Sequence, residues 1–149
     1  MRLLEKNSGV TAYSLTTMRA MDYCDLGVPP LDAYEKAGKE FLGTQSVRDK
    51  PCPMGAFIGP CEFGLVRNIK AGDYKWRRRN ELETKRAKDS ANYAISAIRR
   101  LIAEPLLGEL LLVDTPLVKR ELYRWLGIPP SNSQMDIVVG FWIDGRINR

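Results

Sequence analysis

The sequence of 149 residues contains no histidine. This absence excludes a Ser-His-Asp triad and a Cys-His pair, because both use an imidazole as the general base. It also excludes any zinc site with a histidine ligand, and three cysteines are too few for a structural four-cysteine site. No close cluster of carboxylates suggests another metal. We therefore expect no metal, no cofactor and no enzymatic activity.

Long apolar runs are also missing. The longest lies around residues 110–113, far short of the roughly 20 residues that a membrane-spanning helix needs. The first seven residues hold too few apolar side chains for the core of a signal peptide. Cys24, Cys52 and Cys61 are an odd number without paired spacing, which favours reduced thiols over a disulfide framework. These features predict a cytoplasmic protein with no membrane association.

The overall composition suits a globular protein. Hydrophobic residues make up 44% of the chain and charged residues 28%, both ordinary values. A chain of 149 residues usually forms one domain. We therefore expect residues 1–149 to form a single helical domain.

Apolar residues recur at helical spacing along much of the chain, which predicts an all-α fold of about six helices in a compact bundle. The expected helices are 8–24, 30–42, 57–69, 80–104, one that opens at Thr115-Pro116, and a last one from about Ser133 to Gly145. Residues 44–56 and 70–79 are expected to be loops. Residues 106–113 could form either a short helical turn or a strand.

Polar residues and glycines indicate how these helices begin and end. Ser8 is expected to cap the first helix, and Thr115 is expected to cap the helix that begins at Pro116. Asn80 and Glu83 resemble a capping box for the long helix. Gly43 is expected in the left-handed conformation after a helix end.

The segment around 57–69 has an unusual number of small residues. We interpret them as a structural motif, because small side chains at this spacing let another backbone approach closely. A glycine loop that faces a ligand is the alternative, but the spacing matches neither phosphate-binding glycine pattern. The residues of this motif are Cys52, Gly55, Gly59, Cys61 and Gly64.

Three parts of the chain together resemble a known family: the segment 51–69, with its Cys-Pro-x-Gly-Ala-Phe-x-Gly core at 52–59, and the shorter segments 32–37 and 132–139. They resemble a family of small bacterial helical proteins that is known only as a domain of unknown function, over about residues 9–147. Two features depart from the family pattern: Pro60 stands where leucine is usual, and residues 75–79 are more basic. The resemblance implies a helical, standalone bacterial protein and supplies no activity or catalytic residue.

The positive charge of the chain is concentrated in residues 67–88. This basic segment holds nine basic and three acidic residues, a net charge of +6, whereas the remaining fourteen basic and fifteen acidic residues give −1. The whole net charge of +5 therefore lies in 22 residues. The nine cations are Arg67, Lys70, Lys75, Arg77, Arg78, Arg79, Lys85, Arg86 and Lys88.

Such a segment predicts binding to nucleic acid without sequence preference. Its cations can neutralise phosphates and release counterions, and Tyr74 and Trp76 can stack on bases. A solvated basic loop and a docking site for an acidic protein are the alternatives. The expected binding residues are Arg67, Lys70, Lys75, Trp76, Arg77, Arg78, Arg79, Lys85 and Arg86.

A helix-turn-helix at 116–144 fits this sequence poorly. Its second helix would begin with Ser133, Gln134 and Asp136, and no lysine or arginine occurs from 131 to 145. The preceding helix carries the cations instead. A helical hairpin packed by Trp125 and Trp142 is the simpler interpretation.

Two further function classes are open to this sequence. Cys52 and Cys61 are the only candidate nucleophiles in a special setting, but no general base accompanies them, and Glu62 would disfavour a thiolate at Cys61. The alternative to nucleic-acid binding is a protein–protein interaction module, for example a homo-oligomer, which uses the aromatic and methionine side chains of the C-terminal helices.

Overall fold

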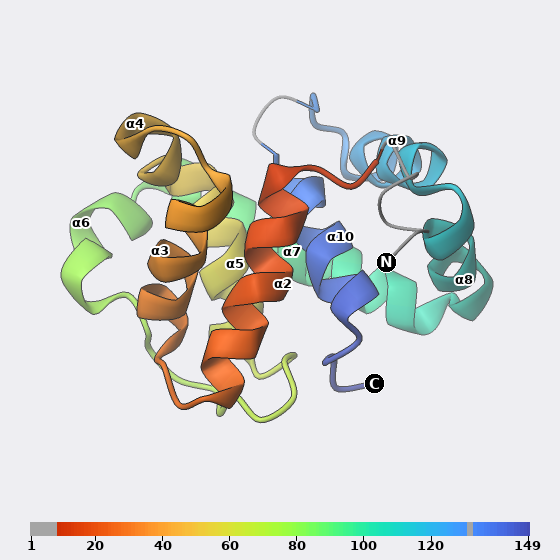
Figure 1. The fold of residues 1–149 in the computed structure, drawn as a ribbon. Coiled ribbons are helices and arrows are strands. Elements are labelled where there is room, and N and C mark those ends of the chain that lie inside the picture. Colours follow the sequence, from red (N-terminus) through yellow and green to blue (C-terminus); the bar gives the residue numbers. More distant parts are fainter. Residues whose placement is uncertain (1–8, 131–132) are drawn as a thin grey trace.

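The computed structural model describes residues 9–130 and 133–149, and this part of the chain is all-α (Figure 1). It contains seven helices of nine residues or more, so the expected count of six is low. The longer helices are α2 (Ala12–Asp25), α3 (Pro30–Phe41), α5 (Pro51–Phe63), α7 (Lys85–Ala103), α8 (Pro105–Val113), α9 (Thr115–Leu126) and α10 (Gln134–Asp144). Short helical segments form α4 (Gln45–Arg48), η1 (Trp76–Arg78) and α6 (Arg79–Leu82).

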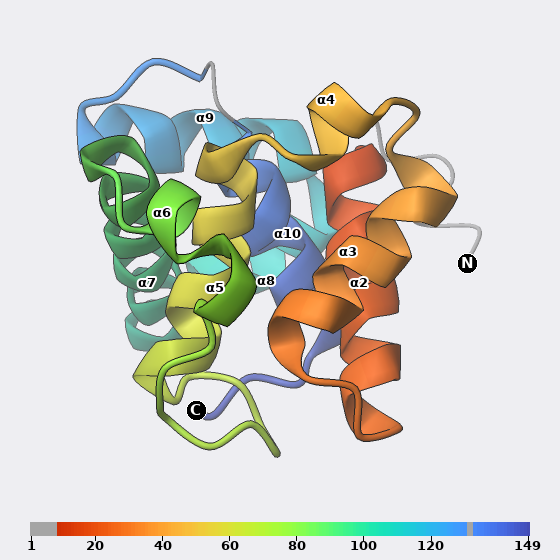
Figure 2. The same ribbon diagram turned by 90° about the vertical axis from the view of Figure 1, so that its left-hand side faces the viewer.

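Helix α10 lies at the centre of the bundle. It contacts α2, α5, α7, α8 and α9, and eight of its eleven residues are buried. Figure 2 shows α5 and α10 between α7 on one side and the α2–α3 pair on the other. Helices α8 and α9 form the end of the molecule opposite α3 and α4 (Figure 1).

Aromatic rings join three of these helices in the core. The Phe57 ring on α5 lies 5.3 Å from the Tyr34 ring on α3 and stacks at 5.2 Å on the Phe141 ring on α10. All three side chains are buried. Offset or tilted ring pairs at these distances add to the stabilisation from burial alone.

Two glycines bring α5 and α7 into close contact. A Cβ atom added at Gly55 would lie 2.5 Å from the Ala87 carbonyl oxygen, and one added at Gly59 would lie 2.6 Å from the Ala91 Cβ. Neither neighbour can accommodate a side chain at that distance without moving a helix. At these two positions the glycines face the backbone of α7.

The helix that holds this motif begins earlier than expected. It runs from Pro51 to Phe63 rather than over 57–69, and Gly64 ends it in the left-handed conformation with φ 84°. The expected loop 44–56 therefore contains α4 and the first six residues of α5. Proline suits the first helical turn, where its missing N–H needs no partner. The expectation of a loop over residues 44–56 was wrong for this reason.

The expected long helix 80–104 is interrupted near its start. Thr84 begins α7, and its hydroxyl accepts a hydrogen bond from the Ala87 N–H at 3.3 Å. The capping box expected from Asn80 and Glu83 is therefore wrong, and these residues lie in and just after the single-turn α6. Threonine directly before an apolar helical repeat is itself a strong N-cap signal.

Several other expected boundaries change as well. Asp114, rather than Thr115, caps α9 and accepts from the Leu117 N–H at 3.3 Å. Residues 106–113 are helical, as part of α8. Gly43 does not take the left-handed conformation, because α3 ends at Leu42 in an extended one. The cap expected at Ser8 lies outside the described residues.

The C-terminal residues return to the end of α5. Val66 and Ile147 form an isolated antiparallel bridge, and the described residues contain no β-strand. The Arg67 N–H donates to the Arg146 carbonyl at 2.8 Å. Among the residues from 9 to 130 and from 133 to 149, no helix is long and apolar enough to cross a membrane.

The close contact between α5 and α7 generates a stability prediction. Gly55→Ala should lower the free energy of unfolding by about 1–3 kcal/mol, because its methyl group would clash with the Ala87 carbonyl. Gly43→Ala is the matched control, since no atom lies within 4 Å of its added Cβ, and it should change stability by less than about 0.5 kcal/mol. Urea unfolding measures both variants. Equal stabilities of the two variants would contradict the close-packing interpretation.

Candidate functional site

The arginines of η1 are tied to helix α3 and the end of α4. Arg77 pairs with Asp32 and, at 2.6 Å, with Glu35. Arg78 donates to Glu35 and to Asp49, both at 2.9 Å. Hydrogen bonds to the Glu35 carboxylate raise the pKa of both guanidinium groups. These two arginines therefore serve an ion-pair network that anchors η1.

The residues before and after these arginines are also paired. The Lys75 ammonium lies 2.6 Å from the Glu62 carboxylate, which also accepts a hydrogen bond of 2.6 Å from the Tyr74 N–H. Arg79 pairs with Asp73 at 2.8 Å. Glu62 thus holds the chain segment that follows α5 against that helix.

The folded chain neutralises most of the charge of the basic segment. Five of its nine cations form ion pairs, and five of their acidic partners come from outside residues 67–88. Those partners are Asp32, Glu35, Asp49, Glu62 and Asp89. Together with them, the net charge of +6 falls to +1. The electrostatic attraction to phosphates is correspondingly weaker than the sequence alone predicts.

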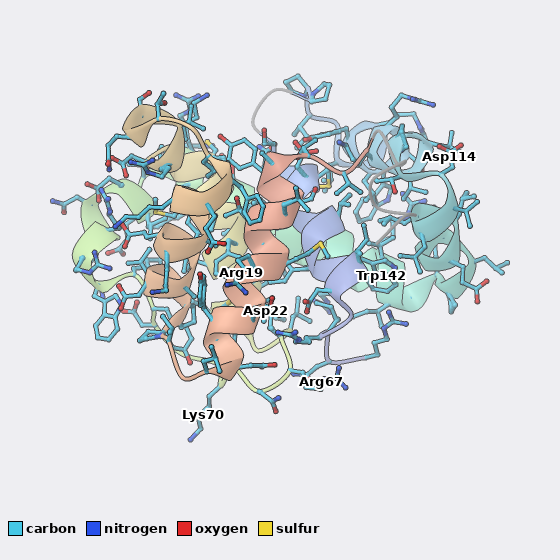
Figure 3. The ribbon with its side chains drawn as sticks, in the orientation of Figure 1. Arg19, Asp22, Arg67, Lys70, Asp114 and Trp142 are labelled. Carbon is cyan, nitrogen blue, oxygen red and sulfur yellow. The ribbon has the colours of Figure 1, made fainter. Side chains whose placement is uncertain are left out.

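Four cations of the segment have no ion pair among the described residues: Arg67, Lys70, Arg86 and Lys88. Arg67 does donate a hydrogen bond to the Gly145 carbonyl at 3.3 Å. Figure 3 shows Lys70 projecting away from the lower edge of the molecule, with Arg67 along the same edge. Trp76 is also exposed. The expected site residues are thus divided between an internal ion-pair network and a few available side chains.

A second surface of the molecule is apolar. Helix α8 buries only Gly108 and Leu111, although nearly all of its side chains are aliphatic. Leu106 is 80% exposed and Val113 is 79% exposed, and both lie on one stripe of the helix. We call this surface the α8–α9 apolar face; it consists of Leu106, Leu110, Leu112, Val113 and Leu117. Large exposed apolar patches mark interaction sites in soluble proteins.

Two charged side chains lie on the same surface. Glu109 follows Leu106 by one helical turn on α8, and Arg120 follows Leu117 by one turn on α9. Both are exposed, and neither has an ion pair within residues 9–130 and 133–149. Sequence reasoning missed this face, because a stretch as apolar as residues 105–113 has the composition of a buried element. Glu109 in the middle of the run was the signal that one side meets solvent.

The C-terminal helices do not resemble a DNA-reading pair. Helix α10, which would be the recognition helix, is mostly buried at the centre of the bundle. Asp136 near its start pairs with Lys119 of α9. Trp142 is buried and its indole N–H donates to the Gly108 carbonyl at 2.8 Å, whereas Trp125 is about half exposed. Only one of the two tryptophans therefore packs as expected.

The cysteines are poorly placed for nucleophilic chemistry. All three are free thiols, and Cys52 and Cys61 are buried. Burial raises the pKa of the Cys61 thiol well above its ordinary value. Burial, with a smaller effect of Asp25, raises the pKa of Cys24 to about 12. The described part of the chain also contains no group of three or more Cys, Asp or Glu side chains that could hold a metal ion.

Comparison with known proteins gives a family but no activity. No curated protein and no solved structure matches the chain. A family model described as "Family of unknown function (DUF6979)" matches residues 10–148. This match covers nearly the whole chain and confirms the expected resemblance to a family of unknown function. The chain therefore belongs to the DUF6979 family.

Proposed function

We propose that this protein is a protein–protein interaction module that self-associates through the α8–α9 apolar face. The observation that carries the proposal is the exposure of five large aliphatic side chains on two consecutive helices. Removal of such surface from water is favourable by about 25 cal/mol per Å². A second copy of the same face is the simplest partner that would cover it.

The charges on the face support a second copy as the partner. In a two-fold symmetric dimer the same surface is used by both copies, so that each contact occurs twice. An antiparallel arrangement places α8 of one copy along α9 of the other. Glu109 of each copy then lies near Arg120 of the other, and both unpaired charges gain a partner. The face is self-complementary in this sense.

The proposal assigns a binding role rather than a catalytic one. The raised pKa values of Cys24 and Cys61 disfavour the thiolate that covalent catalysis would need. The three free thiols fit the cytoplasm, where thiols stay reduced. The charge and shape of the α8–α9 apolar face then determine which partner binds, and binding needs no reacting group.

Substitution of the most exposed residues of the face tests self-association. Leu106→Glu combined with Val113→Glu should convert the dimer to a monomer, because two buried charges would oppose the interface. Leu26→Glu is the matched control: Leu26 is 79% exposed at the end of α2, away from α8 and α9. Sedimentation velocity over a concentration series measures the mass, and thermal unfolding checks that the fold is kept. A monomeric wild-type protein at every concentration would refute the proposal.

Charge exchange tests the symmetric arrangement. Glu109→Arg and Arg120→Glu should each weaken association by about fivefold or more, because a symmetric dimer loses two ion pairs and gains two repulsions. The combined variant should recover most of the loss, since the same pairs form with their signs reversed. Sedimentation equilibrium gives the dissociation constants. If the combined variant associates as weakly as the sum of the single changes, Glu109 and Arg120 do not face each other.

Binding to nucleic acid is the second candidate function. The observation in its favour is the set of exposed cations without ion pairs, Arg67, Lys70, Arg86 and Lys88, together with the exposed ring of Trp76. The ion pairs of the other five cations weigh against it, because each would have to be broken or shared with a phosphate. We therefore expect weak binding with few phosphate contacts.

A salt series measures this binding directly. With at most four available cations, the logarithm of the affinity for duplex DNA should fall with the logarithm of the salt concentration with a slope no steeper than about −4. Arg67→Ala with Lys70→Ala should lower the affinity without loss of stability, whereas Arg77→Ala with Arg78→Ala should mainly destabilise the fold. Fluorescence anisotropy and thermal unfolding separate the two effects. Absence of binding at low salt would exclude this second function.

A further inference from the structure

A cavity of about 340 Å³ lies between α5, α7 and the segment 75–82, which crosses them. Its walls are largely apolar and include Ile58, Phe63, Leu82 and Ile95. Gly59 and Ala91, which bring the two helices together, line its base. Figure 2 shows α6 and the segment before it in front of α5 and beside α7. A volume of this size is within the range of small-molecule sites.

The ion pair between Lys75 and Glu62 forms one side of the cavity. These side chains lie 2.6 Å apart and are mostly shielded from solvent. Glu62 also accepts from the Tyr74 N–H, so its carboxylate is satisfied inside the protein. Neither charge needs a ligand. The pair therefore lines the cavity and ties residues 74 and 75 to α5.

Two other groups that line the cavity have no partner among the described residues. Lys88 and Asn92 both come from α7 and line the cavity one helical turn apart. Both side chains are exposed and have no hydrogen bond or ion pair to any residue in the ranges 9–130 and 133–149. The three charged groups that line the cavity sum to +1, and Lys88 carries the charge that remains uncompensated.

We propose that this cavity binds an amphipathic monoanion, namely a medium-chain carboxylate. The carboxylate would accept from the Lys88 ammonium and the Asn92 amide at the mouth, which are donors that suit a carboxylate. The alkyl chain would lie along Ile58, Phe63 and Ile95. The small volume favours a single short chain over a diacyl lipid. This proposal concerns α5 and α7 and does not depend on self-association through α8 and α9.

Calorimetric titration with decanoate, below its micelle concentration, tests the proposal. Each methylene buried in the cavity should strengthen binding by about fourfold, so that affinity rises from hexanoate to octanoate to decanoate. Lys88→Ala should weaken decanoate binding by about tenfold or more, because it removes a charged hydrogen-bond donor. Lys85→Ala is the matched control: it removes the same charge from the same helix, but Lys85 pairs with Asp89 and does not line the cavity.

The head group and the wall give two independent checks. Decylamine, which has the same chain with the opposite charge, should not bind. Ile95→Trp should narrow the cavity and abolish the dependence on chain length, while thermal unfolding confirms that the variant is folded. No heat of binding with decanoate would overturn the proposal. So would an equal loss of affinity in the Lys85 and Lys88 variants, or binding of decylamine as tight as that of decanoate.

Discussion

The close approach of α5 and α7 at Gly55 and Gly59 is the contact on which the rest of the structure depends. Because no side chain separates the two backbones there, α5 is held at a fixed depth in the bundle. Its Phe57 ring can then reach Tyr34 on one side and Phe141 on the other. These ring contacts join α5 to α3 and α10, and α2 contacts both of those helices as well. The same approach leaves room at the edge of the contact, where the cavity forms.

The basic segment shows how sequence charge and spatial charge differ. Along the chain, residues 67–88 carry a net charge of +6, which predicts a surface for polyanions. In the folded protein, five acidic residues from outside this segment pair with its cations. These residues lie on α3, at the end of α4, on α5 and on α7. Asp32, Glu35 and Asp49 are separated from Arg77 and Arg78 by more than 25 positions in the chain, whereas Asp89 lies only four positions from Lys85. The distant partners are not apparent from the local sequence, and the boundary at residue 88 leaves out the near one, so the isolated segment overstates the available charge.

Sequence reasoning succeeded where a physical signal is local. The helical periodicity predicted the all-α class, and Gly145 ends the last helix as expected. It failed where two local signals compete. Prolines at 51 and 53 can extend a chain or begin a helix, and tertiary burial of α5 decides for the helix. It also failed at α8, because an apolar run does not reveal which of its sides the rest of the chain covers.

Contacts of Arg100 and Trp142, which lie outside the apolar face, hold α8 and α9 against the rest of the bundle. Arg100 at the end of α7 is 15% exposed and pairs with Glu104 at 2.7 Å and with Glu121 of α9 at 2.9 Å. Its guanidinium also lies over the Trp125 ring, 4.9 Å from the centroid. On the inner side, Trp142 packs so closely on Gly108 that α8 can carry no side chain at that position. Of these contacts, the packing of Trp142 on Gly108 acts on α8 itself, and it turns the Gly108 side of the helix toward the core. The stripe of Leu106 and Val113 lies outward as a consequence of that packing, which supports the proposal that the face is a binding surface.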